Sequence, residues 1–264
     1  MQRRTFMTVA AASAFSGVLP QARGQVTDLS DAINKAGRQR MLSQRMGKAW
    51  LALLQNVEQT SAQLVLDKSM VLFERQLQEL KTFAPTPEVR TTYNRLDAAW
   101  FDYKTALVGT QPRRGNAAAL LQLDAKVLGL AHQGTQQFEA VQSRPVGKLV
   151  NMAGRQRMLT QRMAKFYLAA TLPVESAMAG AEIQKARTEF TAAMGVLRNA
   201  PQATARIKEE LMLADAQWVF FDAALQQLQG GSQNAKPLAN VFVASENLLT
   251  VMDRVTGLFA IGST

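Results

Sequence analysis

The chain is 264 residues long, contains no cysteine and only one histidine, and carries a formal net charge of +10. The absence of cysteine excludes disulfide bonds, thiolate metal sites and thiol nucleophiles. With one histidine and no HExxH, GxSxG or phosphate-loop pattern, the sequence predicts neither an enzyme nor a bound metal or cofactor.

Residues 1–24 have the layout of an export signal. The adjacent Arg3 and Arg4 are followed by an apolar stretch over residues 8–19 and by small residues at 22–24. The paired arginines resemble the twin-arginine type, and the apolar stretch is shorter than the ~18 to 20 residues that a membrane-spanning helix needs. We therefore expect cleavage near residue 24 and a soluble periplasmic protein, with an uncleaved anchor as the alternative.

The segment INKAGRQRMLSQRM, which begins at Ile33, returns as VNMAGRQRMLTQRM, which begins at Val150. Residues further along also correspond, such as Trp100 and Trp218. The chain therefore divides into two repeats, residues 25–143 and 144–264, each of an ordinary single-domain size.

Proline and glycine breaks divide each repeat into four long segments, in which apolar residues recur at three and four positions without sustained alternation. We predict helices at residues 28–58, 60–83, 87–108, 116–142, 146–171, 176–199, 202–229 and 235–260. Short connections favour antiparallel neighbours, so the predicted fold is all-α, with two tandem antiparallel four-helix bundles. The sequence leaves open whether the bundles pack side by side or end to end.

On a helical wheel, the repeated motif has a narrow seam of small residues with one arginine in its middle. Ile33, Ala36 and Arg40 share this seam in the first copy, and Val150, Ala153 and Arg157 share it in the second. Small residues let a second helix approach closely. We therefore predict that the two motif helices face each other, as equivalent surfaces do in an isologous dimer.

Arg40 and Arg157 would then meet near a pseudo-twofold axis, where two guanidinium groups repel each other. Such a pair calls for an anion, and the planar fork of arginine suits a planar oxyanion. Residues that would add donors or space are Gly37, Gly154, Asn34, Asn151, Ser43 and Thr160. The alternative is that the two arginines form ordinary ion pairs with acids such as Asp97 and Asp215.

The remaining candidate residues are expected to have structural roles. The motif methionines and the tryptophans at matched positions of the two repeats, Trp100 and Trp218, are expected in the core. His132 is expected to be an exposed or packed helix residue. The other motif arginines are expected to form a solvated basic face: Arg38, Arg45, Arg155 and Arg162. Four acids are expected to be salt-bridge partners: Asp97, Asp102, Asp215 and Asp222.

The pattern Asn-x-Ala-Gly-x-x-Arg-Met-x-Ser/Thr-x-Arg resembles the helix-one signature of NarX-type nitrate and nitrite sensor domains and of the PilJ-type N-terminal domain of pilus-linked chemotaxis transducers. Both copies fit at every position. The resemblance implies a periplasmic four-helix bundle that holds nitrate or nitrite between the signature helices of two subunits. It implies that Arg40 and Arg157 clamp the anion and that Gly37 and Gly154 line its site.

This chain departs from the sensors because both signature helices lie in one polypeptide and no kinase or methyl-accepting segment is recognisable. We expect an exported, non-enzymatic module that binds a small oxyanion, preferably nitrate or nitrite, and acts with a membrane receptor. It would be a monomeric pseudo-dimer or a homodimer.

The alternative function is an adaptor whose seam docks a helix of a membrane receptor or pilus-linked transducer, without a small ligand. Export, the lack of a nucleic-acid motif and the few aromatics near the basic segments exclude nucleic acid as a partner. Weak contact of a basic face with an anionic membrane surface is an accessory expectation.

Overall fold

The computed structural model describes residues 25–142, 145–172, 176–227 and 235–262. The expected export signal, residues 1–24, lies outside these ranges. The described ranges contain eight α-helices, one short 3-10 helix at Arg114–Asn116 and no strand. The predicted all-α class is therefore confirmed.

The helices follow one another along the chain with short connections. They are α1 (Leu29–Leu54), α2 (Gln59–Phe83), α3 (Pro87–Val108), α4 (Ala117–Val141), α5 (Pro145–Ala169), α6 (Ser176–Asn199), α7 (Ala205–Leu225) and α8 (Ala235–Ile261). Most bounds lie within two residues of the predicted ones. The larger differences are at the end of α1 and at both ends of α7, where the prediction extended the helices too far.

Local backbone chemistry explains several of these ends. Asp28 caps α1, because its carboxylate accepts a hydrogen bond of 2.9 Å from the backbone N–H of Asp31. Thr86 caps α3 in the same way, with Pro87 as the first helical residue. Helix α1 ends before the predicted residue 58, since Asn56 and Glu58 adopt positive φ angles of 56° and 47°.

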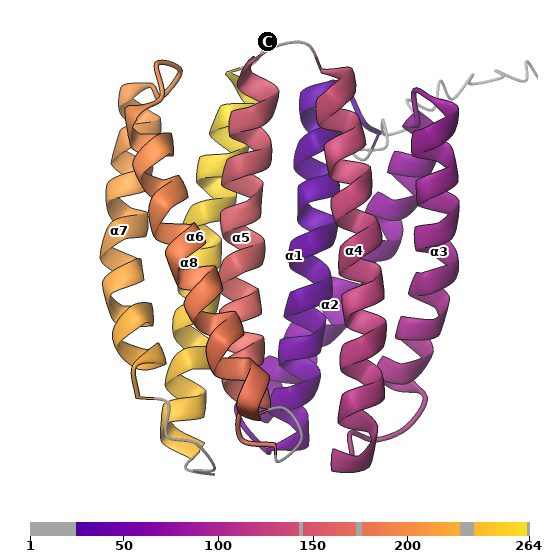
Figure 1. The fold of residues 1–264 in the computed structure, drawn as a ribbon, viewed down its shortest axis with the longest axis vertical. Helices are drawn as coiled ribbons and strands as arrows, with labels where there is room; N and C mark the ends of the chain where they lie inside the picture. Colours follow the sequence, from indigo (N-terminus) through magenta and orange to yellow (C-terminus); the bar gives the residue numbers. More distant parts are fainter. Residues whose placement is uncertain (1–24, 143–144, 173–175, 228–234, 263–264) are drawn as a thin grey trace, which may run out of the picture.

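The two repeats form two bundles that lie side by side, with α1–α4 in one and α5–α8 in the other (Figure 1). Helices α1 and α5 are neighbours in the middle and make the most extensive contact between the repeats. They run in the same direction, because both begin at the end where the short connection joins α4 to α5. The sequence left the choice between side-by-side and end-to-end packing open, and the structure shows the former.

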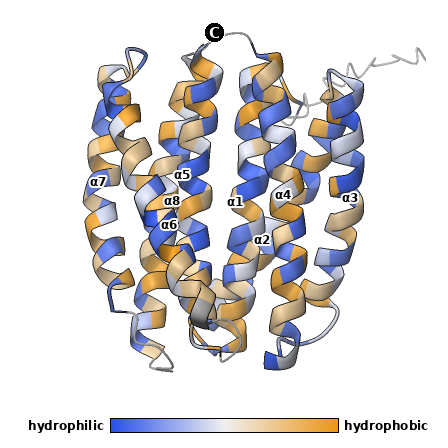
Figure 2. Cartoon of the chain, viewed as in Figure 1, coloured by the Kyte–Doolittle hydropathy of each residue, from blue (hydrophilic) through white to orange (hydrophobic). Residues whose placement is uncertain are grey.

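Most of the helices have a polar and an apolar face, as amphipathic helices in a bundle do, and α7 is the exception because it also exposes large apolar residues (Figure 2). Matched aromatic pairs anchor the two bundles: the ring centroids of Phe73 and Trp100 are 4.4 Å apart, as are those of Phe190 and Trp218. Trp100 is buried and Trp218 is partly buried. Four of the five motif methionines are buried as predicted, namely Met41, Met46, Met158 and Met163, and Met152 is partly buried.

No helix in the described part of the chain is both long enough and apolar enough to cross a membrane. Burial is concentrated instead on α1 and α5, whose motif segments are enclosed on nearly all sides by the other helices. Polar residues of the motif are therefore carried into the interior, and each of them needs a partner there.

Candidate functional site

Helices α1 and α5 approach closely at Gly37 and Gly154. A Cβ atom on Gly37 would lie 3.8 Å from the Cα of Gly154 and 3.2 and 3.6 Å from the Nη2 atoms of Arg40 and Arg157. A Cβ on Gly154 would lie 3.3 and 3.8 Å from the Nη2 atoms of Arg157 and Arg40. The two guanidinium groups therefore converge on the glycine pair, which leaves room for them because it has no side chains.

The two arginines cross to the opposite repeat. Arg40 Nη2 donates to Oδ1 and the carbonyl oxygen of Asn151 at 2.7 and 3.3 Å. Arg157 Nη2 donates to Oδ1 and the carbonyl oxygen of Asn34 at 2.9 and 3.0 Å. Both arginines are fully buried. These residues form what we call the arginine layer: Arg40, Arg157, Asn34, Asn151, Gly37 and Gly154.

The surroundings of the two arginines differ. Arg157 Nη1 forms an ion pair with Asp253 on α8, which also accepts from Arg38 at 2.8 Å. Arg40 Nη1 faces Nδ1 of His132 on α4 at 3.3 Å, and Arg40 has no carboxylate partner in the part of the chain that the structure describes. The Nε atom of each arginine is buried without a hydrogen-bond partner. Among the described residues, the two buried cations therefore have one directly paired carboxylate, Asp253. A second carboxylate, Glu139, accepts a hydrogen bond from the side-chain amide of Asn151 and does not contact Arg40 directly.

Burial, together with the neighbouring charges, lowers the pKa values of the cationic groups. The pKa of Arg40 is lowered to about 9, mainly by burial and in part by the positive charges of Arg155 and Arg157. Burial lowers the pKa of Arg157 to about 10, although Asp253 opposes the effect. Burial, Arg40 and Arg155 lower the pKa of His132 to about 4, so its ring is neutral at pH 7.

A second polar layer lies further along the same two helices. Lys48 Nζ donates to Ser245 Oγ at 2.8 Å and to Glu246 at 2.6 Å, and burial lowers its pKa to about 8. Lys165, the matching lysine of the second motif, forms an ion pair with the buried Asp124. We call these residues the lysine layer. The lysine layer was not predicted from the sequence. The signal that could have indicated it is the recurrence of Lys48 and Lys165 at the same spacing as the two motifs.

Several predicted ligand donors have other partners. Ser43 Oγ donates to the carbonyl oxygen of Arg40 at 2.9 Å, and Thr160 Oγ1 donates to that of Gln156 at 2.9 Å. These hydroxyl groups would have to rotate to donate to an anion. The structure therefore brings the arginines, glycines and asparagines together, while the two hydroxyl groups bond to their own helices.

The alternative, ion pairs of the two arginines with acids on other helices, is confirmed for Arg157, which pairs with Asp253 on α8. The two acids named as examples are not the partners of either arginine. Asp97 pairs with Lys81 at 2.6 Å, and Asp215 pairs with Arg198 at 2.6 Å. Both acids lie on third helices, which are distant from the centre of the molecule. The broader expectation that the four acids are salt-bridge partners is confirmed, since the other pairs are Asp102 with Lys126 and Asp222 with Arg187.

The expected solvated basic face is also wrong. The other motif arginines are partly buried and each is paired with an acid: Arg38 with Asp253, Arg45 with Glu246, Arg155 with Glu189 and Arg162 with Glu182. These acids lie on α6 and α8, which pack against α5 and bring carboxylates alongside the motif. His132 is a packed helix residue, within the range of the prediction, but its contact with Arg40 was not foreseen.

A model of the family described as the type IV pili methyl-accepting chemotaxis transducer N-terminal domain, PilJ, matches residues 25–128 and again residues 140–257. The chain belongs to the PilJ family. The PilJ part of the resemblance is thereby confirmed, in two tandem copies, and PilJ is a sensory rather than a catalytic domain. No curated protein and no solved structure matches the chain.

The two PilJ copies place different residues at equivalent positions of their last helices. Asp124 and Ser245 are 121 positions apart, as are His132 and Asp253. Asp124 and Ser245 contact the lysine layer, whereas His132 and Asp253 contact the arginine layer. Because the residues of each pair differ, the repeat in the sequence does not indicate that these positions contact the motif helices.

Proposed function

We propose that this PilJ protein is an exported sensing module that binds a small oxyanion, preferably nitrate or nitrite, in the arginine layer. One observation carries the proposal: two fully buried arginines, one from each copy, converge on the same pair of glycines, and of the two only Arg157 has a paired carboxylate among the described residues. Sensory function follows from the family, and the anion follows from the chemistry of the layer.

Electrostatics favours an anion at this position. Two unit charges ~4 Å apart repel by about 4 kcal/mol at an effective dielectric constant of 20. Asp253 offsets part of this repulsion on the Arg157 side, but Arg40 has only neutral partners, His132 and Asn151. A bound oxyanion would supply the missing negative charge and would accept charge-assisted hydrogen bonds.

The asparagines suggest how binding would be sensed. Asn34 and Asn151 accept from the Nη2 atoms that an anion would need, so anion binding has to displace two neutral acceptors. Each asparagine belongs to the helix opposite its arginine. Their release would therefore remove two links between α1 and α5 and alter the contact between the copies, which is a change that a membrane receptor could detect.

The adaptor alternative loses its surface in this arrangement. The seam residues that were to dock a partner helix are fully buried: Ile33, Ala36, Val150 and Ala153. They contact the equivalent seam of the other copy, so the seam is already occupied within the chain. The periplasmic location and the membrane receptor belong to our proposal and rest on the place of PilJ domains in transducers.

Thermal unfolding of the purified protein in nitrate, nitrite, sulfate and chloride tests the proposal. We expect nitrate or nitrite to raise the melting temperature selectively, corresponding to about 2.7 kcal/mol of stabilisation at a hundredfold excess over Kd. An Arg40→Lys, Arg157→Lys double variant keeps both charges but loses the planar fork, and it should lose most of the effect.

The matched control is Arg198→Lys, because Arg198 pairs with Asp215 on the outer helices away from the layer. This variant should respond to nitrate as the original chain does. Calorimetric titration of the original chain with nitrate provides a measurement that does not depend on any variant folding. Equal responses to all four anions, or an undiminished response in the double variant, would contradict the proposal.

A further inference from the structure

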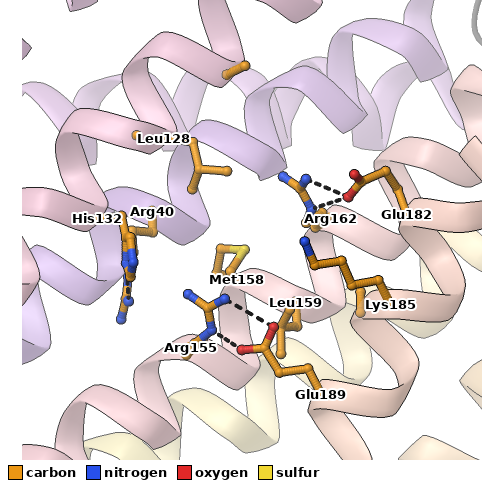
Figure 3. Close-up of a pocket in the computed structure, with 13 residues that line it drawn as sticks. Arg40, Leu128, His132, Arg155, Met158, Leu159, Arg162, Glu182, Lys185 and Glu189 are labelled. Carbon is orange, nitrogen blue, oxygen red and sulfur yellow. Dashed lines mark hydrogen bonds and ion pairs between the residues drawn. The ribbon is translucent and has the colours of Figure 1, made fainter. Parts of the chain in front are cut away.

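A cavity of about 310 Å³ lies between the two copies, beside the arginine layer. Its walls come from α4 of the first copy and from α5 and α6 of the second, and Arg40 of α1 reaches into its lining (Figure 3). This volume is in the range of pockets for small organic ligands. It is therefore larger than a site for a single small oxyanion requires.

The charges in the cavity do not balance. Its lining contains four cationic side chains, Arg40, Arg155, Arg162 and Lys185, and two carboxylates, Glu182 and Glu189. Arg155 pairs with Glu189, and Arg162 pairs with Glu182 at 2.6 Å. Lys185 has no ion pair within the described residues, and Arg40 has no carboxylate partner. Two positive charges are left, at different places in the lining.

The two unbalanced cations lie on opposite sides of the cavity. Figure 3 shows Arg40 and His132 on one side and Arg162 and Lys185 on the other. Between them lie the apolar side chains of Leu128 and Met158 and the ion pair of Arg155 with Glu189. Arg40 is fully buried and its Nε atom has no partner, so one end of the cavity is a desolvated cation. Lys185 is exposed and stands at the accessible end.

We propose that this cavity binds a small organic dianion of the dicarboxylate class, with one carboxylate at the Arg40 end and the other at the Lys185 end. A dianion neutralises the two unbalanced charges, and a short aliphatic spacer fits against Leu128 and Met158. The site is separate from the oxyanion site. Arg40 Nη2 faces Asn151 in the arginine layer, whereas its Nη1 faces His132 in the cavity.

This arrangement makes Arg40 a shared wall between two ligand sites. A carboxylate beside Arg40 Nη1 would offset part of the charge that the arginine layer now carries, and would thereby weaken the attraction for an oxyanion on the other side. The inference does not rest on oxyanion binding, because the cavity, its charges and its apolar side chains are present regardless of what the arginine layer binds.

His132 gives a direct measurement of occupancy. It is the only histidine in the chain, so its ring signals in an NMR spectrum of the untagged protein need no assignment by mutation. Its ring is surrounded by Arg40, Arg155 and Glu189, and a carboxylate arriving beside it would change its chemical shifts and raise its pKa. Glutarate is the probe, and butyrate is the singly charged comparison.

We expect glutarate to produce a saturable shift of the His132 signals and to bind at least tenfold more tightly than butyrate. Lys185→Glu should weaken glutarate binding at least tenfold. Lys68→Glu is the matched control, because Lys68 is an exposed lysine of α2 outside the cavity, and its variant should bind as the original chain does. Both substitutions are at exposed helix positions and should leave the fold intact.

The absence of a saturable shift, equal binding of butyrate, or unchanged binding by Lys185→Glu would overturn the inference. Nitrate titration of the same samples separates it from the proposed function. Glutarate binding without a nitrate effect would support the cavity and remove the oxyanion site, whereas selective nitrate stabilisation with no glutarate shift would do the reverse.

Discussion

Arg40 and Arg157 are equivalent residues of two copies of one domain, yet they are neutralised differently. Each donates to an asparagine of the other copy, but Arg157 also has Asp253 where Arg40 has His132. In an assembly of identical subunits both arginines would have the same neighbours. Joining the copies in one chain allows each copy to change separately, and here the change leaves a cation without a carboxylate on one side only.

The lysine layer shows the opposite distribution of charge. In this layer the first copy supplies the buried carboxylate, Asp124, while the second supplies Ser245 together with the partly exposed Glu246. In the lysine layer, therefore, the more deeply buried carboxylate comes from the first copy. In the arginine layer, the carboxylate that pairs with an arginine comes from the second copy. Substitutions at these equivalent positions should change the free energy of unfolding by unequal amounts. Which copy shows the larger change in each layer tests the comparison.

The largest effect is expected from Asp124→Asn. This change removes the carboxylate from Lys165, which is almost completely buried, and breaking such a pair costs about 3–5 kcal/mol. Ser245→Ala at the equivalent position should cost only about 1 kcal/mol, because Lys48 keeps Glu246. Urea unfolding measures both. Similar losses for the two variants would show that the lysine layer does not depend on where its carboxylate lies.

A pH series should separate the two copies. His132 has a folded pKa of about 4 against an ordinary 6.5, so its contribution is complete above pH 6.5 and is lost as the pH falls towards 4. Burial acts to raise the pKa of Asp253 and of Glu246, but the neighbouring cations lower both to about 2. Their contribution is therefore complete above pH ~4 and is lost towards pH 2.

We expect His132→Asn to flatten the stability profile only between pH 6.5 and 4. The original chain should lose about 1–2 kcal/mol of unfolding free energy in this range, and the variant should not, since His132 is partly exposed and solvent screens its interactions. Glu246→Gln is the matched variant in the second copy, and it should flatten only the lower range. Unfolding free energies measured across both ranges check this division, which a flattening of the same range by both variants would contradict.

His132→Asp should make the first copy resemble the second. A carboxylate at this position would face Arg40 as Asp253 faces Arg157, and should stabilise the protein by about 1 kcal/mol at pH 7. The same change should weaken nitrate stabilisation, because the uncompensated charge would be gone. Denaturation with and without nitrate measures both effects. A destabilised variant that still binds nitrate would show that the missing carboxylate is not what attracts the anion.

The smallest effect concerns two glycines, Gly257 on α8 and the motif glycine Gly37. Gly257 on α8 has open space around it, so Gly257→Ala should stabilise the helix by about 0.5–1 kcal/mol. At Gly37 the same change places a Cβ 3.2 Å from Arg40 Nη2, and the buried guanidinium has little room to move. Gly37→Ala should therefore bring no gain. Equal stabilisation of both variants in thermal melts would argue against close packing at the arginine layer.

The helices were predictable because their signals are local. Proline, glycine and capping residues set most ends within two residues, and the seam containing Ile33 and Ala36 correctly indicated which face of α1 meets α5. The end of α1 was missed. Asn tolerates a positive φ angle, so Asn56 was a weak signal for it, whereas the positive φ of Glu58 is not expected from its residue type.

The partners of the arginines were not predictable by the same reasoning. Asp253 and His132 lie 96 and 92 positions from the arginines that they contact, on last helices whose polar residues differ between the copies. Helix periodicity indicated which residues face inward, but not which inward-facing acid meets which arginine. Asp97 was therefore a reasonable candidate by spacing, although in the fold it pairs with Lys81.

The parallel contact of α1 with α5 also has a consequence for assembly. A site shared by two separate subunits disappears on dilution, whereas two helices tied into one chain remain at a high effective concentration whatever the amount of protein present. The arginine layer is complete in a single copy of this chain. Its affinity for a ligand should therefore be the same in dilute and concentrated protein, and each molecule should respond independently of every other.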